Sequence, residues 1–176
     1  MKNISKGEEL NFLNDDKQIV YFLKSGTIKI VDALSNKTLH IVKKGNLFGE
    51  LALISDEGSD KAVVLEDGMI CFIEAEQMKI MMENYPSLKN GILKMSGIRI
   101  KKLQNQIKDL IYKDSETRIK EYINSYVKEF GESSDGVKWA KNLLSHSDIA
   151  HLTNTSRQTV NNVLSKLRKE GVIYYD

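Results

Sequence analysis

The chain has 176 residues, of which 41% are hydrophobic, enough apolar material for one sizeable domain or two small ones. Its formal net charge of +2 is weak evidence for a polyanionic partner, and its single cysteine, Cys71, excludes an intrachain disulfide framework. Residues 1–6 contain no apolar segment typical of a signal peptide, and no run of about 18 apolar residues occurs that could span a membrane. These features predict a soluble cytoplasmic protein.

Short β-rich segments separated by turn residues occupy residues 6–74. The predicted strands are 19–23, 27–31, 38–42, 63–65 and 69–73. Ser25-Gly26 should separate the first two strands, and Glu66-Asp67-Gly68 should form a hairpin turn between the last two. This spacing predicts an antiparallel sandwich or barrel. A doubly wound nucleotide-binding fold is not expected, because no Gly-rich loop followed by a long helix occurs.

Two helices should follow the strands. The first is expected at 76–83 and should stop at Tyr85-Pro86, and the second should run from Ser87 to about Tyr112. Apolar residues recur along the second helix near the three-and-four spacing of a helix seam: Leu88, Ile92, Met95, Leu103, Ile107 and Leu110. Arg99 and Gln106 interrupt this seam. It could pack on the chain's own β domain or on a second copy.

The next segment is expected to be a helix capped by Asp114 or Ser115 and running to Phe130. A loop is predicted at 131–136, followed by a short strand at 137–139 in which Trp139 joins the core.

Residues 145–173 (SHSDIAHLTNTSRQTVNNVLSKLRKEGVI) have the pattern of a helix–turn–helix. Ser145-x-x-Asp148 is a capping pattern for the first helix, Thr153-Asn154 provides the break, and Thr155-x-x-Gln158 should cap the second helix. The second helix has an apolar face opposite a face of amide, guanidinium and hydroxyl groups. Such groups match the donors and acceptors of base edges in the DNA major groove, whereas the alternative is a solvated face in an ordinary bundle.

Thr155-Ser-Arg-x-Thr-Val160 and Leu167-x-x-Glu-Gly-x-Ile173 resemble the helix–turn–helix of the cyclic-AMP receptor protein and FNR (CRP/FNR) family of bacterial transcription regulators. VYFLKSGTIKI at 20–30 and GNLFGELAL at 45–53 look like the cyclic-nucleotide-binding β-roll of the same family. The resemblance implies an α+β fold with an N-terminal antiparallel β-roll at 1–85 and a long dimerisation helix at 86–113. A winged-helix-type helix–turn–helix domain with a shortened wing should occupy 114–176.

The resemblance also implies a homodimer, paired through 86–113, that binds a near-palindromic site in double-stranded DNA. RNA polymerase and a small effector of unknown identity are further candidate partners. By resemblance, the base-reading residues are Arg157, Gln158, Asn161 and Asn162, and the candidate phosphate contacts are Ser145, Ser147, Ser156, Thr159 and Lys166. Ser145 and Ser156 also have a capping explanation that requires no DNA.

Arg157 can bond guanine N7 and O6. Gln158 replaces a glutamate that is common in the family, and its amide suits adenine; Asn162 stands where an arginine is common. We therefore expect a half-site that differs from the TGTGA of the cyclic-AMP receptor protein.

In the β-roll, a Gly-Glu-Leu turn faces the cyclic phosphate and its glutamate accepts from the ribose hydroxyl, so the candidate effector pocket comprises Gly49, Glu50, Leu51 and Lys61. However, Asp60 and Lys61 stand where the family has an Arg-Ser or Arg-Thr pair, and Lys61 can compensate only if it turns inward. We therefore predict that the chain does not bind cyclic AMP with physiological affinity. The Gly49–Leu51 segment is either a structural turn or a cradle for a different effector.

No cofactor or metal is predicted, because one cysteine is too few for an iron–sulfur cluster and His40 is expected to be a solvated strand-edge residue. An enzyme is disfavoured, since no histidine lies near a plausible nucleophile and acid. The remaining alternative to a DNA-binding regulator is an effector-binding protein with weak or vestigial DNA binding.

Overall fold

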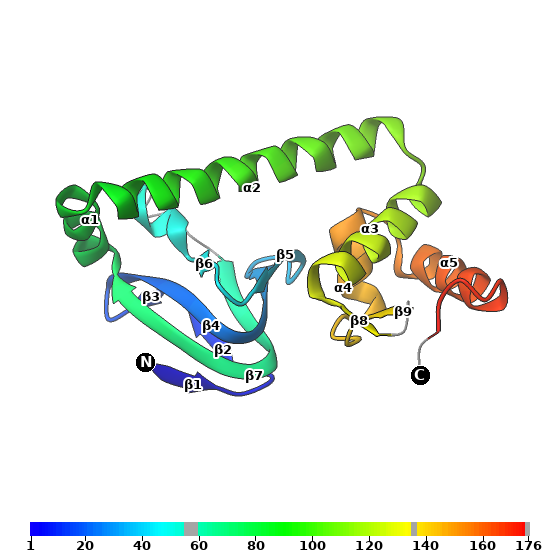
Figure 1. The fold of residues 1–176 in the computed structure, drawn as a ribbon, viewed down its shortest axis with the longest axis horizontal. Coiled ribbons are helices and arrows are strands. Elements are labelled where there is room, and N and C mark those ends of the chain that lie inside the picture. Colours follow the sequence, from blue (N-terminus) through cyan, green and yellow to red (C-terminus); the bar gives the residue numbers. More distant parts are fainter. Residues whose placement is uncertain (55–59, 135–136, 175–176) are drawn as a thin grey trace. The chain divides into compact units, whose positions relative to one another are not determined.

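The computed structural model describes residues 1–54, 60–134 and 137–174 (Figure 1). The chain divides into two compact units, Met1–Leu103 and Gln104–Asp176. The first contains an antiparallel sheet and the second contains the helix–turn–helix, so the predicted α+β class is confirmed.

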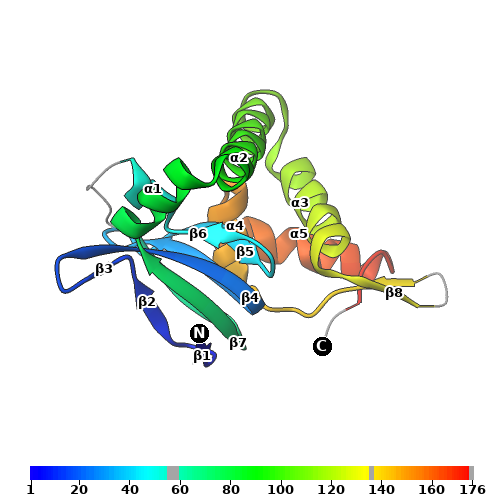
Figure 2. The same ribbon diagram turned by 60° about the vertical axis from the view of Figure 1, so that its left-hand side comes forward.

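Two long strands organise the sheet of the first unit. β4 (Lys17–Asp32) and β7 (Asp60–Glu74) pair antiparallel along most of their length (Figures 1 and 2). The short strands β1 (Lys2–Ile4) and β2 (Glu9–Asn11) pair with β7. β3 (Leu13–Asn14), β5 (Thr38–Lys43) and β6 (Leu47–Phe48) pair with β4.

Each of the long strands contains two of the predicted strands, so the hairpin turn predicted at Glu66-Asp67-Gly68 is wrong. The register between β4 and β7 shifts at three points between Leu23 and Ile28, as expected for β-bulges. Gly26 has φ +89°, and a Cβ on Gly68 would lie only 2.0 Å from the carbonyl oxygen of Ser25. The turn-forming residues therefore let the paired strands bend without ending them.

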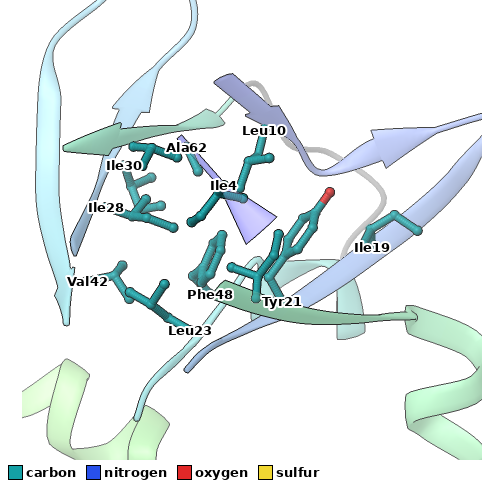
Figure 3. Close-up of a cluster of buried hydrophobic side chains, with 12 residues drawn as sticks. Ile4, Leu10, Ile19, Tyr21, Leu23, Ile28, Ile30, Val42, Phe48 and Ala62 are labelled. Carbon is teal, nitrogen blue, oxygen red and sulfur yellow. The ribbon is translucent and has the colours of Figure 1, made fainter. Parts of the chain in front are cut away.

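The sheet closes around an apolar core (Figure 3). Side chains from several strands meet there, and Leu23, Ile28, Phe48 and Ile70 are fully buried. Burying a side chain of this size contributes about 2 kcal/mol. This core fixes the β domain on which the candidate effector pocket is built.

Two helices follow the sheet, close to their predicted bounds. α1 (Ala75–Asn84) ends before Pro86, which is the first residue of α2 (Pro86–Tyr112). Near its start α2 packs Leu88 and Ile92 into a second apolar cluster of the first unit. Later apolar residues of α2 are exposed: Leu93, Ile98, Ile100, Leu103, Ile107, Leu110 and Ile111.

The second unit contains α3 (Ser115–Phe130), a hairpin of β8 (Glu132–Ser134) and β9 (Val137–Trp139), α4 (His146–Thr153) and α5 (Arg157–Lys169). A hairpin therefore replaces most of the loop predicted at 131–136, of which 135–136 lie outside the described residues. The predicted core placement of Trp139 is wrong, because its exposed fraction is 48%.

The core of this unit comes from α3, α4, α5 and Leu144, which precedes α4, with Ile119 and Val160 fully buried. The predicted shortened wing concerns the segment after α5, and its last residues, 175–176, lie outside the described part of the chain. None of the helices in the described residues is long and apolar enough to cross a membrane.

Candidate DNA-binding face and effector pocket

The two helices of the helix–turn–helix are delimited by local hydrogen bonds. Ser145 caps α4 in a reciprocal box with Asp148, as predicted, and Asn154 ends α4 with a left-handed backbone at φ 48°. The cap of α5 is Ser156 instead of Thr155, because the Ser156 hydroxyl accepts from the backbone N–H of Thr159 at 3.0 Å. The second helix therefore begins at Arg157.

α5 has one buried and one exposed face. Val160, Val163, Leu164 and Leu167 are buried, whereas Arg157, Gln158 and Asn162 are exposed. The Gln158 Nε2 atom donates to Asn162 Oδ1 at 3.0 Å, one helical turn away. This places a guanidinium and two amides together on the outer side of the helix.

Asn161 lies apart from these three residues. It is partly buried, and its Oδ1 atom is bonded to Nδ1 of His146 on α4. Oδ1 can only accept, so His146 Nδ1 is the donor. The structure thus places this predicted base-reading residue in the contact between α4 and α5.

Most of the candidate phosphate-contacting residues already have partners within the protein. The Ser145 hydroxyl accepts a hydrogen bond from the backbone N–H of Asp148, and the Ser156 hydroxyl accepts one from the backbone N–H of Thr159. The Thr159 hydroxyl lies 2.8 Å from that of Ser156. Ser147 is partly buried in the first turn of α4. Helix capping therefore explains why serine stands at both positions, and no contact with DNA is needed for that explanation.

Lys166 forms a 2.8 Å ion pair with Glu116 of α3. Hydrogen bonds from Lys120 and Lys166 lower the pKa of Glu116 to about 2, and the same contact raises the pKa of Lys166. The positive charge of Lys166 is therefore opposed by a carboxylate before any phosphate approaches.

In the first unit, the Gly-Glu-Leu segment forms a short 3₁₀ helix, η1 (Glu50–Leu53), after β6. Gly49 has φ +77°, and a Cβ on it would lie 2.7 Å from the ring of Phe12. Glycine is thus required by the local packing, which supports the structural explanation of this motif.

Arg99 of α2 enters the same pocket, which the sequence did not predict. One Nη atom pairs with the Glu50 carboxylate, and the other lies 2.8 Å from Nε2 and 3.1 Å from Nδ1 of His40. Arginine only donates, so His40 accepts with a neutral ring. The available signal was a charged residue in an otherwise apolar helix seam.

His40 is partly buried, so the expectation of a solvated histidine is wrong. Burial, followed by the positive charges of Arg99 and Lys102, lowers its pKa to about 3. His40 is consequently neutral across the physiological range, as the hydrogen bond from Arg99 requires.

The remaining pocket residues leave little room or positive charge for a cyclic phosphate. Asp60 lines the pocket with Gly49, Glu50 and Leu51, and its pKa is raised by burial and by the charge of Asp32. The cavity has a volume of about 40 Å³, well below the roughly 300–1,000 Å³ of typical ligand sites.

Lys61 does not belong to this group. Its Nζ atom forms a 2.8 Å ion pair with Glu9 on β2, and alternation along β7 directs successive side chains to opposite faces. The inward turn that would let Lys61 compensate for the missing arginine is therefore absent from this structure. Among the described residues, no group of three or more His, Cys, Asp or Glu side chains could hold a metal ion.

A β domain with a Gly-Glu-Leu pocket, followed by a long helix and a capped helix–turn–helix, defines a DNA-binding regulator with an effector-type domain. Residues 1–85 match the model of the cyclic nucleotide-binding domain, and residues 126–176 match that of the Crp-like helix-turn-helix domain. The chain belongs to the CRP/FNR family of transcription regulators.

Curated relatives agree with this assignment. The chain is 29% identical over 167 residues to the anaerobic regulatory protein of Bacillus subtilis, covering 92% of this chain and 70% of that protein. It is 25% identical over 175 residues to the fumarate and nitrate reduction regulatory protein of Escherichia coli, with 98% and 70% covered. These proteins are transcription regulators, and the family is not one of enzymes.

Solved structures share the fold. A CRP-family transcriptional regulator of Thermus thermophilus superposes with a TM-score of 0.79 at 22% identity, covering 100% of this chain and 88% of that one. A mutant of CooA from Carboxydothermus hydrogenoformans gives 0.76 at 23% identity, with 98% and 78% covered. At these identities the likeness shows the fold alone.

Proposed function

We propose that this regulator acts as a homodimer that binds a near-palindromic site in double-stranded DNA and does not depend on cyclic AMP. The observation that carries the proposal is the outer face of α5, where Arg157, Gln158 and Asn162 are exposed while the opposite face is buried. A helix held in this way can enter a major groove with its polar side chains toward the bases.

The polar groups of α5 support a particular half-site chemistry. Arg157 would bond guanine O6 and N7, and Gln158 would bond adenine N6 and N7. One N–H of the Gln158 amide is used by Asn162, which leaves its oxygen and its second N–H for adenine. A guanine beside an adenine, in a half-site other than TGTGA, is therefore our expectation.

The exposed apolar residues of α2 support pairing with a second copy through 86–113. Ile100, Leu103, Ile107 and Leu110 recur at helix-seam spacing and are each more than two-fifths exposed in the single chain. A two-fold axis along this helix would present two copies of α5 to successive major grooves about 34 Å apart. As a regulator of transcription, the dimer would then influence RNA polymerase at the bound promoter.

The pocket supports independence from cyclic AMP. Glu50, whose counterpart in the family accepts from the ribose, is engaged by Arg99, and Asp60 stands near the place of a phosphate-binding arginine. A carboxylate repels a phosphate, and the cavity is too small for a nucleotide as it stands. The one guanidinium that lines the pocket is thus already paired with a carboxylate, and the cavity is small for the ligand.

Sequencing of genomic fragments that the purified protein retains would test the proposal. We expect enrichment of an inverted repeat without added nucleotide, and a dimer mass by light scattering at micromolar concentration. Weak binding that is lost with modest salt and shows no sequence preference would instead favour an effector-binding protein with vestigial DNA binding.

A further inference from the structure

Arg118, in the first turn of α3, bonds to two separate places in the second unit. Its Nε atom donates to the carbonyl oxygen of Thr153 at 3.0 Å, and Nη2 donates to that of Asn154 at 3.2 Å. Nη1 donates to the carbonyl oxygen of Lys113 at 2.6 Å, and Nη2 lies 3.4 Å from the Ser115 hydroxyl. One side chain thus joins the turn of the helix–turn–helix to the junction between α2 and α3.

Both places are helix C-termini, which explains why a cation is favourable there. α2 ends at Tyr112, next to Lys113, and α4 ends at Thr153, next to Asn154. The last carbonyls of a helix have no partner within it and carry partial negative charge. A planar guanidinium can satisfy carbonyls in several directions at once, whereas a lysine ammonium cannot reproduce that fork.

The neighbouring ion pairs do not make the same connection. Lys113 pairs with Asp109 and Glu121, which keeps both contacts at the α2–α3 junction. The pair of Lys166 with Glu116 joins α3 to the later part of α5 and is exposed. The bonds from Arg118 reach the turn that leads into α5, since Arg157 follows Asn154 by three residues.

The end of α2 and the whole of α5 belong to the same compact unit, Gln104–Asp176. In a dimer paired through α2, the separation and tilt of the two recognition helices follow from how each α5 is held to the end of its own α2. The hydrogen bonds of Arg118 therefore connect the turn before each α5 to the end of its own α2.

We propose that Arg118 is a positioning residue that sets the spacing between half-sites which this regulator accepts. The inference rests on the proposed homodimer and goes beyond it, because it gives a role to a residue that is not one of the proposed base readers. Loss of its bonds would leave Arg157 and Gln158 able to read a half-site, while the two copies of α5 would lose their fixed separation.

The test compares the wild-type protein with Arg118→Lys and Arg118→Met. The matched control is Lys128→Met, which removes a positive charge from the exposed far end of α3. Fluorescence anisotropy would measure the affinity for the selected inverted repeat and for repeats with one or two base pairs added or removed between the half-sites. Thermal unfolding and single-half-site binding would be recorded for each variant.

We expect wild type and Lys128→Met to discriminate by about tenfold or more against a changed spacing, within the range that a misfitting site typically shows. Both Arg118 variants should lose most of that discrimination while keeping the same base preference within a half-site. A merely structural role would weaken binding to every spacing by a similar factor. That result, or unchanged discrimination in a folded variant, would overturn the inference.

Arg118→Lys retains the charge and keeps the test usable if Arg118→Met does not fold. A wild-type protein that is monomeric, or that binds all spacings equally, would contradict the proposed dimer and this inference together. Wild-type discrimination that both variants share would contradict only the role of Arg118.

Discussion

At the scale of single residues, the role of Arg99 depends on partners that lie far from it in the sequence. On the sequence it is an interruption in an apolar helix seam, but in the structure it bonds Glu50 and His40 inside the β domain. The partners lie 49 and 59 residues away along the chain, so no local pattern could pair them. The same contact pairs the Glu50 carboxylate with a guanidinium and requires a neutral imidazole at His40.

His40 should therefore make stability depend on pH. Its pKa is lowered from 6.5 to about 3 on folding, mainly by burial, so the unfolded chain binds more protons between these values. The free energy of unfolding should rise with pH through this window, by up to about 1.4 kcal/mol per pH unit from this group. The contribution is complete above pH 6.5 and is lost as the pH falls.

Denaturant unfolding of wild type and His40→Gln at several pH values measures this effect. Glutamine retains an oxygen that can accept from Arg99 but does not titrate. The difference between the two proteins in free energy of unfolding should change as the pH falls below 6.5 and stay constant above it. Parallel stability curves across the whole window would show that His40 is as easily protonated in the folded protein as in the unfolded one.

Gln158 provides a second prediction at the residue scale. Changing Gln158→Glu replaces an amide by a carboxylate, which can accept from cytosine N4 but cannot reproduce the amide's paired contact with adenine N6 and N7. Selection from random DNA should therefore shift one position of the half-site toward cytosine, with a discrimination of about 1–3 kcal/mol.

Lys169→Ala is the matched control for this change, because it alters charge at the other end of α5 without touching the exposed amides. It should weaken binding to all sequences by a similar factor and lower the salt dependence. An unchanged sequence preference in Gln158→Glu would mean that the amide does not face a base.

At the scale of elements, helices that depend on local chemistry were predictable, and strands that depend on distant partners were less so. The Ser145–Asp148 box and the left-handed Asn154 involve neighbours on the chain, and both are present. The bends in β4 and β7 arise where Gly26 and Gly68 approach across the sheet. The residue types there fit a turn equally well, so only the pairing of the two strands distinguishes a bulge from a hairpin.

The same limit applies to the candidate site. The exposed face of α5 followed from helical periodicity, yet the contact of Asn161 with His146 depends on how α4 packs against α5. In the pocket, the Gly49 turn was predictable from its motif, whereas the ion pair of Lys61 with Glu9 depends on the register of β2 on β7. The face on which a side chain lies was therefore predictable within a single helix or strand, whereas its partner on a neighbouring element was not.

α2 supports a prediction about assembly. Ile107 is 57% exposed in the single chain, and pairing through the α2 seam would bury it against a second copy. Ile107→Glu would place a charge in that apolar contact, so we expect a monomer by light scattering with unchanged helix content by circular dichroism. DNA binding should weaken strongly, because the two half-sites would no longer be engaged together.

Lys101→Glu serves as the control, since this exposed residue lies on another side of the same helix and changes its charge in the same direction. It should remain dimeric. A dimer that persists in Ile107→Glu would place the pairing surface elsewhere.

At the scale of the whole molecule, the DNA-binding unit and the effector-type domain differ in how well they keep the chemistry of the family. In the second unit, α5 is capped by Ser156 and begins with the exposed Arg157. In the first unit, Arg99, Glu50, His40 and Asp60 line a small cavity. Under the proposed function, DNA binding by the second unit does not require a nucleotide in the first. DNA should therefore stabilise the protein against unfolding, whereas cyclic AMP should not.

Thermal unfolding in the presence of cyclic AMP or of DNA tests this difference. A ligand present at about 100 times its dissociation constant stabilises the folded state by about 2.7 kcal/mol, so micromolar binding of cyclic AMP would raise the Tm measurably at ~0.1 mM nucleotide. We expect no shift with cyclic AMP, because Asp60 repels the phosphate and Arg99 engages Glu50, and a clear rise with the selected inverted repeat. Arg157→Ala should reduce the rise with DNA and leave the nucleotide result unchanged. A saturable Tm increase with cyclic AMP in the wild-type protein would show instead that the pocket opens to admit the nucleotide.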